Sequence, residues 1–204
     1  MPERSIQIFL QTALSHTFVA LLKGSESVDL IKTYLDFKSD NTYVADMETL
    51  LARNLFKPVQ LDRIYVLTGP GYFTGIRAGL VIAKAFCDSL RINVGLMDSF
   101  DYLRACIPEE KDVSIVIAAS RKEGYLARFQ NRQKVSEELI ALSMLESLPG
   151  KEAIFSETPF IQTTFAAIPI HPKPVLCKTI HLVTESAQMI PHYIRGEADL
   201  FQVI

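Results

Sequence analysis

A short glycine-rich turn is the stretch of this sequence with the clearest capacity for chemistry. Gly69 and Gly71 flank Pro70 directly before a long apolar segment. A turn of this kind at a helix N-terminus can hold a phosphate through free backbone N–H groups. The spacing differs from both well-known phosphate loops, because Phe73 stands where G-x-G-x-x-G requires its third glycine and no Gly-Lys-Ser/Thr follows. Spacing alone therefore favours a tight strand–helix connection.

The other reactive side chains show no catalytic or metal-binding spacing. No two histidines stand in H-x-x-x-H or H-E-x-x-H order, which would place two imidazoles on one helix face. No serine lies in a G-x-S-x-G setting, and three scattered cysteines form no C-x-x-C pair. We therefore expect free thiols, no metal, no cofactor and no catalytic residue, with a patch at residues 192–195 as a contact candidate. The four histidines are His16, His171, His181 and His192, and the three cysteines are Cys87, Cys106 and Cys177.

The glycine turn stands between a predicted strand and a predicted helix. Residues 63–68, RIYVLT, are rich in β-branched and aromatic side chains, as buried strands are. Thr74 is a reasonable N-cap for the following helix. Gly75, Gly79 and Ala83 are four residues apart and share one helix face. Because an interior glycine costs about 1 kcal/mol against alanine, two of them indicate that something approaches the helix backbone closely.

The remaining elements alternate between strands and helices around this unit. Hydrophobic periodicity predicts three strands first, then an amphipathic helix from Tyr43 to Leu55 that ends before Pro58. After a loop at 108–111, the pattern indicates a strand, its hairpin partner and an amphipathic helix ended by Pro149-Gly150. The other expected strands are 5–11, 17–22, 28–37, 93–96, 113–119, 125–130 and 153–155; the other expected helices are 98–107, 136–148 and 174–188, with 158–174 as loop with some strand.

The order of these elements predicts the fold. Three strands, a helix, a strand, a helix and a strand form the ribonuclease-H-like unit of actin-like ATPases. We therefore expect an α/β protein of two such lobes, each with a mixed β-sheet flanked by helices. The first lobe, 1–97, would contain the glycine turn, and the smaller second lobe would comprise 98–204.

Composition indicates an ordinary globular protein. Of 204 residues 49% are apolar and 22% charged, and the net charge of -2 lacks the basic excess of a protein that holds nucleic acid through phosphates alone. The N-terminal apolar run is interrupted by Gln7, Gln11 and His16, so we interpret it as two strands rather than a signal peptide. No stretch reaches the length of a membrane span. We expect a cytoplasmic protein.

The glycine segment also resembles a known family. GPGYFTGIRAGLVIAKAF is similar to the GPGSFTGxRxGxxxAKG signature of the TsaB (YeaZ-type) proteins. Glu123 and Tyr125 resemble part of the family's D-A-R-x-x-E-V-Y segment, and residues 191–195, PHYIR, resemble its closing P-x-Y-L-R. The resemblance implies a non-catalytic partner in bacterial tRNA threonylcarbamoyladenosine synthesis. It would bind the catalytic subunit TsaD, act together with the ATPase TsaE, and reach tRNA only indirectly.

The resemblance further implies where the partner binds. In TsaB proteins the two helices of the first lobe form a helix bundle with TsaD, and the same surface could form a homodimer when TsaD is lacking. The large apolar side chains are more often core than interface, whereas the glycine face is better suited to a partner helix. The candidate interface residues are Tyr43, Met47, Leu50, Leu51, Gly75, Arg77, Gly79 and Ala83.

Two positions where actin-like ATPases carry acidic residues are neutral here. Gln11 stands at the family's I-D-T segment, followed by Thr12, and Ala118 stands at its D-A-R segment; with Gly69 and Gly71 these residues would mark a degenerate nucleotide site. An amide binds magnesium weakly compared with a carboxylate. We therefore expect no ATP hydrolysis, although Gln11 has a second interpretation as a strand residue whose amide is satisfied by neighbours. The alternative functions are an actin-like ATP-dependent phosphotransferase and a glycoprotease-like peptidase.

Overall fold

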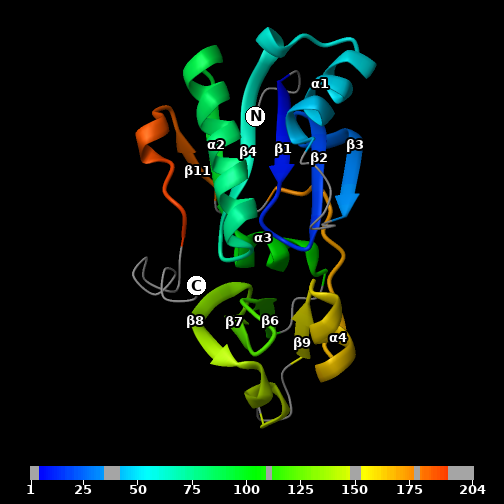
Figure 1. The fold of residues 1–204 in the computed structure, drawn as a ribbon, viewed down its shortest axis with the longest axis vertical. Coiled ribbons are helices and arrows are strands. Elements are labelled where there is room, and N and C mark those ends of the chain that lie inside the picture. Colours follow the sequence, from blue (N-terminus) through cyan, green and yellow to red (C-terminus); the bar gives the residue numbers. More distant parts are fainter. Residues whose placement is uncertain (1–4, 35–41, 109–111, 148–152, 177–179, 193–204) are drawn as a thin grey trace.

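The structure is a computed structural model that describes residues 5–34, 42–108, 112–147, 153–176 and 180–192. Two β-sheets follow one another along the long axis of the molecule, each with its own helices (Figure 1). This is the expected α/β architecture of two lobes with mixed sheets, and the prediction of fold class is confirmed.

The first sheet contains β1 (Ile6–Gln11), β2 (His16–Lys23), β3 (Glu26–Tyr34), β4 (Leu61–Gly69), β5 (Asn93–Asp98) and β11 (His181–Val183). Their order is β11-β5-β4-β1-β2-β3. The first three strands form an antiparallel meander, β4 and β5 continue in parallel from β1, and β11 closes the edge in antiparallel pairing with β5. Every residue of β1 is buried, as is typical of a central strand covered on both faces.

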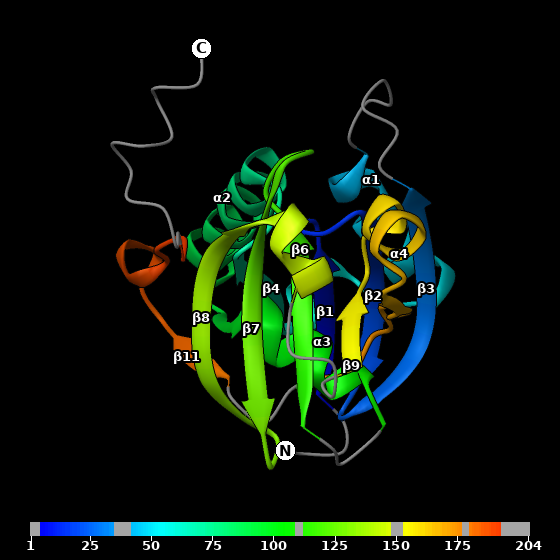
Figure 2. The same ribbon diagram turned by 90° about the horizontal axis from the view of Figure 1, so that it is seen from below.

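Three helices pack on the first sheet. α1 (Tyr43–Arg53) contacts β2 and β3, and α2 (Phe73–Leu90) contacts β4 and β5; both lie on the same face (Figure 2). η1 (Pro58–Gln60) leads from α1 toward β4. α3 (Ser99–Cys106) packs against β4 and β5 and also contacts β6 of the second sheet, so it lies at the junction of the two lobes (Figure 1).

The second sheet repeats the hairpin pattern of the first. Its order is β10-β9-β6-β7-β8; β6, β7 and β8 form an antiparallel meander, β9 is parallel to β6, and β10 is parallel to β9. A continuous apolar core includes side chains from both sheets, and a smaller cluster lies under α4 and η2. The elements are β6 (Val113–Ala118), β7 (Glu123–Gln130), β8 (Gln133–Ala141), η2 (Leu142–Ser147), β9 (Ala153–Ser156), α4 (Pro159–Phe165), β10 (Ile168–Pro169) and η3 (Ser186–Gln188).

Three predictions of local structure in the second half were wrong. The expected helix 136–148 is strand β8 followed by the 3-10 helix η2, because pairing with β7 outweighs the helix propensity of its Glu and Leu residues. The expected helix 174–188 is replaced by β11 and η3, with residues 177–179 outside the described residues. Residues 158–174, expected as loop with some strand, do contain the short strand β10, but they also contain the unexpected helix α4, which begins with a proline in its first turn.

The chain returns to the first sheet after the second is complete. β11 adds to β5, so the first sheet draws strands from both halves of the sequence. Asp98 is both the last residue of β5 and the N-cap of α3. The domain boundary after residue 97 stays a prediction. Among the described helices, none combines the length and apolar character needed to cross a bilayer.

Candidate functional site

The glycine turn lies against the connection between β1 and β2. Helix α2 begins at Phe73 with Tyr72 as its N-cap, so the prediction that Thr74 caps the helix was wrong; Thr74 lies within the first turn. The backbone N–H of Tyr72 donates to the carbonyl of Ala13 at 2.7 Å. This bond leaves the Tyr72 amide no capacity to bind a ligand while the contact persists.

The small residues of the turn and of α2 are explained by contacts within the chain. A Cβ at Gly71 would overlap the carbonyl of Ala13, and a Cβ at Gly75 would overlap the carbonyl of Thr12. A Cβ at Gly79 would stand 2.5 Å from the Thr12 hydroxyl oxygen, which itself donates to the Gly75 carbonyl at 2.6 Å. The close neighbour that the sequence indicated is therefore present within the chain, in the residues that follow β1, and a partner contact at these positions stays a prediction.

The larger residues predicted for a partner interface mostly face the interior. The four apolar residues on α1 are at most 4% exposed, and Gly79 and Ala83 on α2 are buried as well. The core interpretation therefore holds for these side chains in the free chain, and any partner must contact their exposed neighbours. The buried α1 residues are Tyr43, Met47, Leu50 and Leu51.

The side chain of Gln11 makes two hydrogen bonds within the β1–β2 turn. Its side-chain Nε2 donates to the backbone carbonyl of His16, and its Oε1 accepts from the backbone N–H of Leu14 at 3.2 Å. An amide can do both, whereas an ionised carboxylate can only accept. The structure thus agrees with the second interpretation of Gln11, a strand residue whose amide is satisfied by neighbours.

Glu157 closes the same turn from the second lobe, and sequence reasoning missed it. It directly follows β9, is fully buried, and its Oε2 accepts from the Ser15 backbone N–H at 3.1 Å and from the Ser15 hydroxyl. The Thr158 hydroxyl donates to Oε1 at 2.9 Å. The signal that could have found it is position, because Glu157 follows β9 as the glycine turn follows β4. Both turn N–H groups, at residues 14 and 15, are therefore bound by side chains of this chain.

The counterpart position in the second lobe carries no charge. Ala118 is the last residue of β6 and is nearly buried. The following hairpin turn is closed by hydrogen bonds from the backbone N–H groups of Ala119 and Ser120 to the carbonyl of Glu123. The ends of β1 and β6 thus carry a neutral amide and a methyl group in place of the carboxylates that bind magnesium best.

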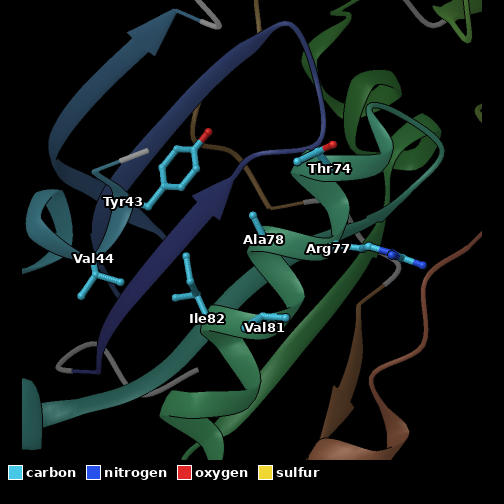
Figure 3. A pocket seen from close by; sticks show the side chains of 7 residues that line it. All are labelled: Tyr43, Val44, Thr74, Arg77, Ala78, Val81 and Ile82. Atoms are coloured by element: carbon cyan, nitrogen blue, oxygen red, sulfur yellow. The ribbon is translucent and has the colours of Figure 1, made fainter. Parts of the chain in front are cut away.

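A groove between α1 and α2 is open to the surface. It encloses about 380 Å³ and is mostly apolar (Figure 3). Val81 is 64% and Val44 44% exposed. Arg77 lines this groove, and its guanidinium lies 3.9 Å from the centre of the Phe73 ring, a cation–π arrangement. Its role as a polar contact to a partner stays a prediction. The residues of the α1–α2 groove are Tyr43, Val44, Thr74, Arg77, Ala78, Val81 and Ile82.

A cluster of charged side chains joins the two lobes between the start of α3 and strand β8. Asp98 caps α3 by accepting from the N–H groups of Phe100 and Asp101, and its second oxygen lies 2.9 Å from His192 Nδ1. Lys134 and Glu137 of β8 complete the cluster. The sequence singled out His192 together with residues 193–195, which lie outside the described residues, and gave no indication of these partners.

Comparison with known proteins identifies the family of this chain. Residues 44–187 match the family model of TsaD, tRNA N6-adenosine threonylcarbamoyltransferase. The chain is 32% identical over 118 residues to an uncharacterized MG208 homologue of Mycoplasma pneumoniae, and 27% identical over 123 residues to the tRNA threonylcarbamoyladenosine biosynthesis protein TsaB of Bacillus subtilis. These alignments cover 57% and 60% of the chain, which spans 59% and 54% of the length of the two relatives.

The fold has a close counterpart among solved structures. An uncharacterized Pseudomonas aeruginosa protein with similarity to the peptidase YEAZ superposes with a TM-score of 0.68 at 17% identity, covering 94% of this chain and all of the other. At this identity the match establishes the fold alone. With the family match across residues 44–187, the chain belongs to the family of the tRNA N6-adenosine threonylcarbamoyltransferase TsaD, in which it is a divergent member of the TsaB (YeaZ) type.

Proposed function

We propose that this chain is a non-catalytic subunit of the machinery that makes N6-threonylcarbamoyladenosine in tRNA. Its task is to bind a TsaD-type catalytic subunit and stabilise it in a productive conformation. The observation that carries the proposal is the family match over residues 44–187, a span that includes the glycine turn and nearly all of both groove helices. The similarity to a protein named for this biosynthesis supports the same pathway.

The non-catalytic part of the proposal is supported by the β1–β2 turn. A nucleotide phosphate at such a turn needs backbone N–H donors and a nearby metal ligand. Here the N–H groups of Leu14 and Ser15 are bound by Gln11 and Glu157, and the hydroxyl of Thr12 is bound to α2. Opening this turn to a ligand would require the second lobe to withdraw its buried carboxylate.

The α1–α2 groove is the surface that suits a helical partner. Its floor is apolar, its rim includes one cation, and Val81 and Val44 leave apolar surface exposed to water. This apolar surface suits a protein–protein contact, because covering it releases ordered water. The same surface would form a homodimer when TsaD is lacking. A TsaE-type ATPase would join the larger complex, tRNA would contact the assembly through other subunits, and the complex would act in the cytoplasm.

Co-elution tests the docking surface. The chain and the TsaD-type protein of the same source are mixed and analysed by size-exclusion chromatography with light scattering, for wild type and for Val81→Glu. A charge buried in an apolar contact should weaken association by about tenfold or more. Val135→Glu is the matched control, since Val135 is comparably exposed, at 53%, on β8 of the second lobe. Equal binding by both variants would contradict the assignment of the groove.

Two measurements on the isolated chain separate the alternatives. Calorimetric titration with magnesium and ATP should give no binding heat, and a measurable dissociation constant would favour the phosphotransferase. Elemental analysis of the purified protein should give no stoichiometric zinc, and a bound metal would favour the peptidase. The molar mass of Val81→Glu alone shows whether any homodimer uses the groove.

A further inference from the structure

Four side chains at the junction of the lobes form a closed ring of alternating charge. Asp98 Oδ2 lies 2.9 Å from His192 Nδ1, and His192 Nε2 lies 3.0 Å from Glu137 Oε1. Glu137 Oε2 lies 2.6 Å from Lys134 Nζ, which returns to Asp98 Oδ2 at 3.2 Å. All four side chains are at most 35% exposed. Charges held this way are screened less than surface ion pairs.

The geometry favours the doubly protonated form of His192. Carboxylates only accept hydrogen bonds, so each ring nitrogen that faces one must carry a proton. Both nitrogens of His192 lie within 3.0 Å of carboxylate oxygens, an arrangement that favours the imidazolium while the cluster is closed. Loss of one proton would place a nitrogen lone pair against a carboxylate and open one side of the ring.

The same geometry argues against a metal ion at this cluster. A metal needs the lone pair of an imidazole nitrogen, and here both nitrogens are committed to carboxylates. The ammonium of Lys134 contacts both Asp98 and Glu137, so its positive charge would repel a divalent ion bound to these carboxylates. Lys134 thus supplies the positive charge that balances the second carboxylate.

The ring holds two separate parts of the chain on the first lobe. Asp98 belongs to the first sheet, whereas Lys134 and Glu137 belong to β8 of the second. His192 ends the described segment 180–192, which contributes β11, and its backbone N–H donates to the Thr68 carbonyl at 2.8 Å.

The segment lies directly on the glycine turn. Gly69 has a φ of +116°, and a Cβ there would stand 2.5 Å from the carbonyl oxygen of His192. His192 therefore fixes the backbone that covers the residue where β4 passes into the turn.

We propose that Asp98, Lys134, Glu137 and His192 form a pH-sensitive clasp that keeps segment 180–192 seated on the glycine turn and β8 bound to the first lobe. The clasp is closed while His192 is doubly protonated and opens when the ring becomes neutral. This device is independent of the proposed function, since it concerns how the chain holds its own segments together.

The charged groups that act on His192 among the described residues set the pH range. The hydrogen bond to Asp98, with the charges of Asp98 and Glu137, raises the pKa of His192 above its ordinary 6.5, against burial and the charge of Lys134. Burial opposes ionisation of Asp98, but His192 and Lys134 outweigh it and lower the pKa of Asp98 below 3.8. A raised histidine pKa stabilises the folded form below about pH 6.5, and this contribution is lost as pH rises through the folded value.

The experiment follows the ring and the segment together in the full chain. NMR titration of the imidazole gives the pKa of His192, and hydrogen exchange gives the protection of its backbone amide between pH 5.5 and 9. Each unit of pKa elevation corresponds to about a tenfold change in the ratio of seated to released segment. We expect protection to fall in wild type as His192 loses its proton, and to be independent of pH in His192→Gln. His181→Gln, on exposed β11, is the control that keeps the wild-type profile.

Two further variants separate a clasp from a merely structural contact. Lys134→Met removes a cation that lowers the His192 pKa, so the transition should move to higher pH; Glu137→Gln removes an anion that raises it, so the transition should move to lower pH. The proposal is overturned if wild-type His192 titrates at or below 6.5, or if amide protection is the same at both ends of the range. It is also overturned if micromolar zinc stabilises wild type but not His192→Gln, which would make the cluster a metal site.

Discussion

The glycines of α2 allow a quantitative test of the packing against β1. Gly79→Ala places a methyl group 2.5 Å from the Thr12 hydroxyl oxygen, far inside normal contact. In the Thr12→Ala background that oxygen is gone, and the nearest remaining Thr12 atom is the Cβ at 3.8 Å. Gly75→Ala differs, because it overlaps the Thr12 carbonyl, which no side-chain substitution removes.

The expected free energies of unfolding follow from two opposing terms. Replacing a helical glycine by alanine stabilises by about 1 kcal/mol, whereas forcing a methyl into a packed site costs about 1–3 kcal/mol. In wild type Gly79→Ala should therefore destabilise the chain by about 0–2 kcal/mol. With Thr12→Ala the cost disappears and the same substitution should stabilise by about 1 kcal/mol. The coupling between the two positions is then about 1–3 kcal/mol.

Urea unfolding of the four chains of this double-mutant cycle measures the coupling directly. The urea dependence must stay constant, so that midpoints report stability alone. Gly75→Ala in both backgrounds is the control, and it should destabilise by a similar amount in each. An equal effect of Gly79→Ala with and without the Thr12 hydroxyl would refute the claim that this contact explains the glycine. It would return Gly79 to the candidates for a partner contact.

Two further predictions concern the β1–β2 turn. Gln11→Glu removes the donor to His16 and buries a charge, so it should destabilise the chain by about 3–5 kcal/mol at pH 8. The loss should be smaller at pH 5, because burial raises the pKa of the new carboxyl and the neutral form is tolerated. An identical loss at both pH values in urea unfolding would contradict this. Glu157→Ala leaves the N–H and hydroxyl of Ser15 without their acceptor, so thermal and urea unfolding should show a loss of about 1–3 kcal/mol. Glu157→Gln should retain most of that stability, and equal losses in the two variants would count against the hydrogen bonds.

The first lobe was predictable because its signals are local. The β-rich run before the glycine turn, the apolar period of α1 and the breaks at Gly69, Pro70 and Pro58 act over a few residues each, and β4, α1 and α2 lie where the sequence indicates. The second lobe was less predictable, because β8 is an edge strand whose residues favour helix when considered alone. Only pairing with β7 makes it a strand, and that pairing is a tertiary contact.

The candidate site likewise has features that could be predicted from sequence and features that could not. The sequence located the glycine turn and the neutral residues Gln11 and Ala118, because these depend on residue type at a position. It did not identify Thr12 as the neighbour of Gly75 and Gly79, since a small helix face indicates close approach without saying what approaches. Glu157 and the His192 clasp were missed because their partners lie up to 142 positions away in the chain.

The amino-acid sequence by itself determined the fold class, the glycine turn and the absence of an acid at Gln11 and Ala118, since each follows from residue type and short spacing. Only the tertiary structure decided which surfaces stay open and which charges meet. Burial and ion pairing are properties of segments brought together by folding: α2 covers the end of β1, a buried glutamate crosses from one lobe to the other, and a histidine near the chain end stands between two carboxylates.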